Sequence, residues 1–154
     1  NISIVWDGKE YQKNLNITQI ERILNILQNK FDISSVNIIG KNKFDHNIPS
    51  VNNLSGKTSL EEALLIIDKS DLVVSVDTGL LHYAAYKRKP IIAIVPHRLR
   101  LANWFPSSGP TALISNIDSK NKYISVKSKK GCELNKEIND VSVSKNLEDL
   151  LKSV

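Results

Sequence analysis

One stretch decides the fold of this chain: Asp71-Leu72-Val73-Val74-Ser75-Val76-Asp77-Thr78-Gly79-Leu80-Leu81-His82. Its first half is apolar and rich in β-branched residues, which predicts a buried strand. The polar triplet after Val76 breaks this pattern, and residues 79–88 then predict a helix that Pro90 stops. Another apolar run, residues 91–95, follows at once. The stretch therefore predicts a strand, a crossover helix and a second strand parallel to the first.

The same alternation extends back to the N-terminus. Apolar, β-branched runs at residues 2–6, 36–40 and 51–54 predict three further strands, with helix-like segments among them. Strands that alternate with helices form a parallel sheet with helices on both faces, joined by right-handed crossovers. We therefore expect one α/β, Rossmann-like domain that covers residues 1–154.

Three helices are expected to begin beside residues that cap helices well. Thr18, followed by Glu21, fits a capping box at the start of the first helix. Thr58 or Ser59 fits the second helix, with a glutamate three residues further on as the partner. Asp77 is a good N-cap residue for the third helix.

The pattern is weaker after residue 95. Residues 96–110 predict a long loop, 122–126 a strand, 141–143 an extended segment and 146–154 a final helix. The chain contains no methionine and begins almost inside a predicted strand. We therefore expect a fragment of a longer, two-domain protein.

Composition bounds the class of protein. The chain has 154 residues, 41% hydrophobic and 24% charged, which is ordinary for a globular domain. No apolar run approaches the ~20 residues of a membrane helix, and no signal peptide is evident. The net charge of +5 favours anionic partners, but aromatic residues are only 6% and do not alternate with basic ones, so no nucleic-acid partner is expected. A single cysteine fits a reducing, cytoplasmic compartment.

Two short motifs suggest other functions and are rejected. Gly56-Lys57-Thr58 resembles the end of a nucleotide-binding P-loop, but the glycine required five residues earlier is Val51. Asp77-Thr78-Gly79 is also the signature of aspartic proteases, which are all-β, whereas here helix-like sequence follows the triplet.

The triplet fits an anion site better. Ligands of open parallel sheets bind beyond the carboxyl ends of the strands. There the amides of Thr78, Gly79 and Leu80 would lie at a helix N-terminus, which attracts phosphate, and His82 could donate a further hydrogen bond. The residues alone leave a purely structural cap as the alternative.

The segment 54–96 resembles the C-terminal domain of family 9 glycosyltransferases, the lipopolysaccharide heptosyltransferases. The family pattern Leu-x-Gly-Lys-Thr-Ser-Leu is matched at residues 54–60, Asp-Thr-Gly-x-x-His at 77–82 and the Pro-led strand from Pro90. Firm support covers about forty residues, and 146–151 resembles the terminal helix loosely. The resemblance implies the C-terminal half of a GT-B enzyme, in which two Rossmann-like domains face a cleft and this one binds a nucleotide sugar, typically ADP-heptose.

The resemblance also implies roles for single residues. Near the nucleoside it places Gly56, Lys57, Thr58 and Ser59, and around the diphosphate and sugar it places Asp77, Thr78, Gly79, Leu80 and His82. The family's phosphate-binding lysine matches Lys13, with Lys9 as the nearest competitor. No metal or other cofactor is implied.

One departure concerns the ribose. The family often holds it with an acidic residue just after the second strand, where only Asn42 or Asp45 could substitute here.

The implied reaction is hexosyl or heptosyl transfer from the nucleotide sugar to lipopolysaccharide or a related glycan or lipid-linked acceptor. The family's catalytic base lies in the N-terminal domain, so this chain alone is expected to bind donor and turn over little. A peripheral contact with the inner face of the membrane is a further expectation. The alternatives are a non-catalytic nucleotide-sugar-binding module and half of a sugar-nucleotide epimerase.

Overall fold

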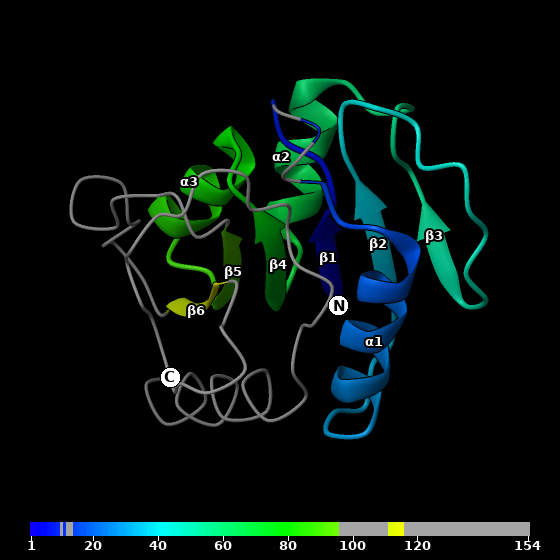
Figure 1. Ribbon diagram of the computed structural model, residues 1–154. Coiled ribbons are helices and arrows are strands. Elements are labelled where there is room, and N and C mark those ends of the chain that lie inside the picture. Colours follow the sequence, from blue (N-terminus) through cyan, green and yellow to red (C-terminus); the bar gives the residue numbers. More distant parts are fainter. Residues whose placement is uncertain (10, 12–13, 96–110, 116–154) are drawn as a thin grey trace.

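The computed structural model describes residues 1–9, 11, 14–95 and 111–115. These residues form a single sheet with three helices packed on it (Figure 1). In chain order the elements are β1 (Ile2–Val5), α1 (Ile17–Gln28), β2 (Val36–Ile39), β3 (Val51–Asn53), α2 (Leu60–Asp68), β4 (Leu72–Val76), α3 (Gly79–Tyr86), β5 (Ile91–Val95) and β6 (Thr111–Ser115).

The sheet is parallel throughout, and its strand order is β3-β2-β1-β4-β5-β6. In the register of the central strands, Ile4 of β1 lies between Ile38 of β2 and Val74 of β4. This is the strand order of a Rossmann fold. The chain adds β2 and β3 on one side of β1 and then returns to add β4 on the other side, so the switch point of the sheet lies between β1 and β4. The predicted α/β class and parallel sheet are confirmed.

Helices cover both faces of the sheet, as the alternation of strands and helices predicts. Ile4 points to the face covered by α1, whereas its neighbour Val5 points to the face covered by α2 and α3. Figure 1 shows α1 on one side of the sheet and α2 and α3 on the other. Successive residues of a strand alternate between faces, so strands buried on both sides must be apolar nearly throughout. All four residues of β1 are buried.

The predicted cap of the first helix is wrong. Asn16, not Thr18, is the N-cap of α1, and its side chain accepts a 2.9 Å hydrogen bond from the amide of Gln19. The side chain of Gln19 accepts one in return from the amide of Asn16. Because the helix begins at Ile17, Thr18 already lies in its first turn, where its hydroxyl cannot serve as the cap.

The second helix resolves an open alternative, and the third gives a correction. Ser59 rather than Thr58 caps α2, in a reciprocal pair with Glu62. The N-cap of α3 is Thr78 rather than Asp77, and the side chain of Thr78 makes no capping hydrogen bond. Thr78 takes the extended backbone conformation immediately before Gly79, which leaves Asp77 one residue too early.

The sixth strand was not expected from the sequence. Residues 111–115 pair in parallel with β5, from Ile91 opposite Thr111 to Val95 opposite Ser115. Their apolar run is only three residues long, which is too short to predict a strand from the sequence. The predictions for residues 96–110, 122–126, 141–143 and 146–154 lie outside the described residues. Among the helices that the structure describes, none is both long and apolar enough to cross a membrane.

Candidate functional site

A cavity of about 650 Å³ opens at the carboxyl end of the sheet, beside the point where the strand order reverses. Its lining comes from the loops after β1, β2 and β4 and from the first turns of α2 and α3. Ligands of doubly wound sheets bind at this point because the loops diverge there and leave a crevice between them. The topology therefore places the cavity where a nucleotide is expected.

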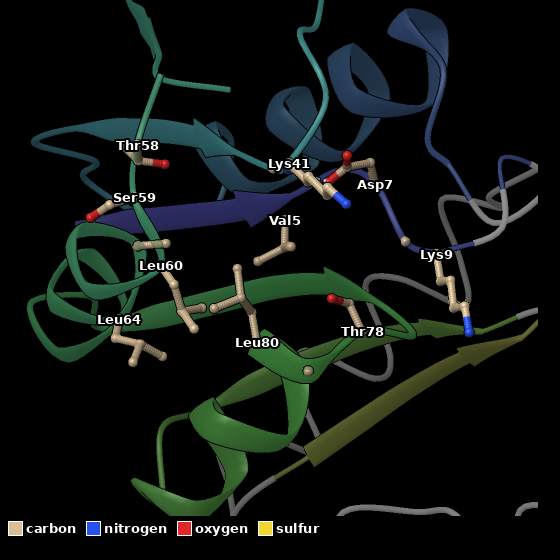
Figure 2. Close-up of a pocket in the computed structure, with 14 residues that line it drawn as sticks. Val5, Asp7, Lys9, Lys41, Thr58, Ser59, Leu60, Leu64, Thr78 and Leu80 are labelled. Carbon is tan, nitrogen blue, oxygen red and sulfur yellow. Dashed lines mark hydrogen bonds between the residues drawn. The ribbon is translucent and has the colours of Figure 1, made fainter. Parts of the chain in front are cut away.

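One wall of the cavity is the start of α3. Thr78, Gly79 and Leu80 line it, and Figure 2 shows the hydroxyl of Thr78 directed into the open space. A methyl group added to Gly79 would meet no atom of the described residues within 4 Å. The first amides of a helix lack intrahelical acceptors, and here the N-cap side chain accepts none of them. This wall therefore presents the N-terminus of a helix, whose dipole is favourable for an anion.

The opposite wall is the start of α2, and it combines hydroxyls with apolar groups. Thr58 and Ser59 line it, followed by Leu60, Ala63 and Leu64. In Figure 2 the side chains of Leu60 and Leu64 lie at the end of the cavity farthest from Thr78. Leu60 is 65% exposed, so its side chain is available to a ligand in the cavity. The cavity thus has an apolar end and a polar end.

The floor is held by the buried carboxylate of Asp7, which is only 4% exposed. Its Oδ1 accepts a 3.1 Å hydrogen bond from the amide of Lys41. Its Oδ2 accepts two from Asn42, at 2.7 Å from the backbone and 2.8 Å from the side chain. A carboxylate that receives several N–H donors offsets the cost of its burial. Asp7 therefore ties the loop after β1 to the loop after β2.

Gly40, at the end of β2, is required by this contact. A Cβ atom at this position would overlap Oδ1 of Asp7 and lie 2.6 Å from Nε1 of Trp6. The backbone of Gly40 also accepts a 2.9 Å hydrogen bond from the amide of Gly56. Only a residue without a side chain lets the loops after β1, β2 and β3 approach so closely.

The structure brings together about half of the residues predicted for the site. Thr58, Ser59, Thr78, Gly79 and Leu80 all line the cavity.

The other predicted residues of the loop before α2 are placed differently. The ammonium of Lys57 donates a 2.8 Å hydrogen bond to the carbonyl of Asn53, and it is absent from the described lining. Gly56 adopts a left-handed backbone conformation, with φ of 67°, against the backbone of Lys43. Both residues shape the turn, and their predicted contact with a nucleoside stays a prediction.

Three predicted phosphate ligands differ in what the structure says of them. Asp77 is half-buried after β4 and His82 is exposed on α3, and neither belongs to the described lining. Lys13 lies outside the described residues, whereas Lys9, its competitor in the same loop, lines the cavity. The roles predicted for Asp77, His82 and Lys13 stay predictions.

Neither residue considered for the ribose reaches the described cavity wall. The side chain of Asn42 donates to Asp7, as described above. Asp45 pairs with Lys43 at 2.6 Å on the surface, and this hydrogen bond, with the attraction of the charges, holds the pKa of Asp45 below its usual value. The residues that do line the cavity after β2 are Gly40 and Lys41.

Sequence reasoning missed several lining residues. Asp7 and Gly8 follow a predicted buried strand directly, which is the signal for a rim loop, yet no role was assigned to them. Lys41 lies in a polar stretch between two predicted strands, and Leu60 and Leu64 have the helical spacing that is typical of a core face. Their exposure to a cavity depends on how α2 packs, which periodicity does not reveal.

The fold and this cavity define a doubly wound α/β domain with an open cavity at its switch point. A model of glycosyltransferase family 9 (heptosyltransferase) matches residues 5–98, and the chain belongs to this family. The resemblance inferred from the sequence motifs is confirmed. Lipooligosaccharide heptosyltransferase 2 of Haemophilus influenzae is 48% identical over 42 residues, which are 27% of this chain and 12% of that protein.

Solved structures agree on the fold. ADP-heptose lps heptosyltransferase II of E. coli superposes with a TM-score of 0.66 at 18% identity, over 98% of this chain and 46% of that one. The dodecameric iron-containing heptosyltransferase TibC, solved with ADP-D-beta-D-heptose, gives 0.65 at 14% identity, over 99% and 45%. A family 9 glycosyltransferase from Veillonella parvula gives 0.64 at 15%, over 99% and 46%. The chain therefore spans less than half the length of these proteins.

Proposed function

We propose that this chain is the donor-binding domain of a glycosyltransferase that uses a nucleoside-diphosphate sugar of the ADP-heptose kind. The observation that carries the proposal is the cavity at the reversal point between β1 and β4, one wall of which is the N-terminus of α3. Two of the similar structures are named for ADP-heptose, as enzyme or as complex. The acceptor is proposed to be lipopolysaccharide or a related glycan.

The two ends of the cavity suggest how the donor lies in it. The diphosphate would sit at the polar end, against the amides of Thr78, Gly79 and Leu80 and within reach of Lys9. The nucleobase would lie at the other end, against Leu60 and Leu64, beside the hydroxyl of Thr58.

In this arrangement the chain stabilises the leaving group of the transfer. Breaking the bond between the sugar carbon and the diphosphate oxygen leaves a nucleoside diphosphate with an additional negative charge. Amides and ammonium groups already directed at those oxygens stabilise this charge without reorganisation. We therefore propose that the reaction needs no metal ion, and that EDTA leaves donor binding unchanged.

The proton acceptor for the attacking hydroxyl is proposed to lie outside these residues, in the part of the enzyme that completes the cleft. The full activity is thus a property of a longer protein, placed in the cytoplasm with a peripheral contact at the inner membrane. The 154-residue chain is expected to bind donor with little turnover.

The test is a calorimetric titration of the chain with ADP, UDP, GDP and ADP-heptose. Binding of a nucleoside diphosphate that Asp77→Ala or His82→Ala weakens supports both the proposal and the roles predicted for these residues. Binding that survives both substitutions but is lost in Gly79→Ala supports the cavity and removes Asp77 and His82 from it. If no nucleoside diphosphate binds, the proposed function is wrong.

A further inference from the structure

Lys41 lies just after β2, near the position that decides ribose recognition in dinucleotide-binding sheets with this strand order. In such sheets, an acidic residue near the end of the second strand accepts hydrogen bonds from the ribose hydroxyls. A nearby cation instead accommodates a phosphate on the 2′-oxygen. Here β2 ends at Ile39, and the residue that lines the cavity after Gly40 is a lysine.

The described wall offers one carboxylate near this point, and it is already engaged. Asp7 accepts three hydrogen bonds from residues 41 and 42, out of the about four that a carboxylate can receive. Its oxygens are directed at the loop after β2, so they hold that loop instead of facing a ribose. The same bonds fix the backbone of Lys41, because its amide is one of the three donors.

The place of Lys41 along the cavity matches the middle of a bound nucleotide. Figure 2 shows Leu60 and Leu64 toward one end, Thr78 and Lys9 toward the other, and Lys41 between them on the side of Val5 and Asp7. A nucleotide with its base on the leucines and its diphosphate at α3 has its ribose in the same intermediate position. The two cavity lysines therefore serve different parts of the ligand.

We propose that Lys41 is a specificity-determining residue that makes the ribose position of this cavity a site for an anionic group. A nucleoside diphosphate that carries a 2′-phosphate then binds more tightly than the unmodified nucleotide. This inference rests on the proposed function, because it assumes that the cavity holds a nucleoside diphosphate.

The test compares the calorimetric affinities of the full chain for ADP and for 2′-phospho-ADP. The wild-type chain is expected to bind 2′-phospho-ADP about five-fold more tightly, as one partly exposed ion pair allows. Lys41→Glu is expected to reverse the order, with ADP preferred about ten-fold, because the new carboxylate repels the phosphate and accepts from the hydroxyl. Lys41→Gln is expected to bind both nucleotides about equally.

Lys43→Glu is the matched control. It makes the same change of charge two residues further along the loop, on a side chain that is 73% exposed and outside the described lining. It is expected to keep the wild-type preference. The inference is overturned if the wild-type chain does not prefer 2′-phospho-ADP, if Lys41→Glu keeps the wild-type order, or if Lys43→Glu reverses it as well.

Failure of the inference can be told apart from failure of the proposed function. If neither ADP nor 2′-phospho-ADP binds, the proposed function is wrong. If ADP binds and Lys41 does not set the preference, only the assignment of Lys41 is wrong. Circular dichroism of each variant checks that these exposed substitutions leave the fold intact.

Discussion

The carboxylate of Asp7 accepts two hydrogen bonds from Asn42, one from its backbone amide at 2.7 Å and one from its side-chain amide at 2.8 Å. The two residues belong to the loops after β1 and β2, which neighbour each other in the sheet. This pair therefore sets the shape of the cavity floor before any ligand arrives. A site that is already formed loses less conformational entropy on binding than one that must be ordered.

Asp7→Asn is expected to destabilise the fold by about 2 kcal/mol. The substitution replaces one acceptor oxygen by an NH₂ group that faces N–H donors, and hydrogen bonds to a charged group contribute about 1.5–3 kcal/mol. Chemical denaturation measures the change. Asn42→Ala removes only one of the donors and is expected to have a smaller effect. Equal effects of the two variants would show that the carboxylate is not the centre of the contact.

Gly40→Ala is expected to destabilise the chain by about 1–3 kcal/mol, because a methyl group there overlaps Asp7 and forces the loops apart. Gly79→Ala is the matched control for stability, since its methyl group meets no atom of the described part of the chain within 4 Å and alanine favours a helix. Thermal unfolding of both variants separates the two cases. A Gly40→Ala chain as stable as the wild type would contradict the close approach.

Gly79→Ala is also expected to weaken nucleotide binding about ten-fold or more while the melting temperature stays equal or rises. Its methyl group projects into the space where a phosphate would approach the first amides of α3. Calorimetric titration with the tightest nucleoside diphosphate measures the loss. Unchanged affinity would mean that the ligand does not contact this wall.

Thr58 and Lys57 are neighbours with different expected roles. Thr58→Val is expected to weaken nucleotide binding several-fold, because it removes a hydroxyl from the cavity wall at nearly constant volume. Lys57→Ala is expected to leave the affinity unchanged, since its ammonium is directed at the carbonyl of Asn53. The same titration measures the affinity of both variants for the nucleotide. A larger loss of affinity for Lys57→Ala than for Thr58→Val would support the nucleoside contact predicted for Lys57.

The cap of α1 gives a comparison within one turn of helix. Asn16→Ala is expected to lower the free energy of unfolding by about 1 kcal/mol, because it leaves the amide of Gln19 without its acceptor. Thr18→Ala is expected to change it by less than about 0.5 kcal/mol, as is usual for exposed positions that cap nothing. Urea unfolding measures both, and a larger effect of Thr18→Ala would favour the cap predicted from the sequence.

The pKa of Asp45 is expected to rise toward its usual value in Lys43→Ala, because the hydrogen bond and the charge of Lys43 hold it down. A lowered pKa in the folded state gives a stabilisation that is present at neutral pH and is lost as the pH falls through that pKa. The pair is fully exposed, so solvent screens it and the midpoint of unfolding at neutral pH should barely change. NMR titration of the carboxyl group measures the shift, and an unchanged pKa would contradict the pairing.

The sequence by itself determined the α/β class, five of the six described strands and the three described helices. It could do so because strands that are buried on both faces appear as continuous apolar runs. Helices appear as apolar residues that recur every three or four positions. It also determined the family, because the motifs at 54–60 and 77–82 occur in the order and spacing of heptosyltransferases. Both signals are local, so no knowledge of distant contacts was needed.

The tertiary structure alone decided which side chains meet. The sequence could not choose between Thr58 and Ser59 as the cap of α2. It placed the cap of α1 at Thr18, because Thr18 and Glu21 fit a capping box as well as Asn16 and Gln19 do. It could not show that Asp7 binds Asn42, 35 residues away, because parallel pairing of β1 with β2 creates that contact. Lys41 becomes a cavity residue for the same reason, since the strand order brings its loop beside the loop after β1.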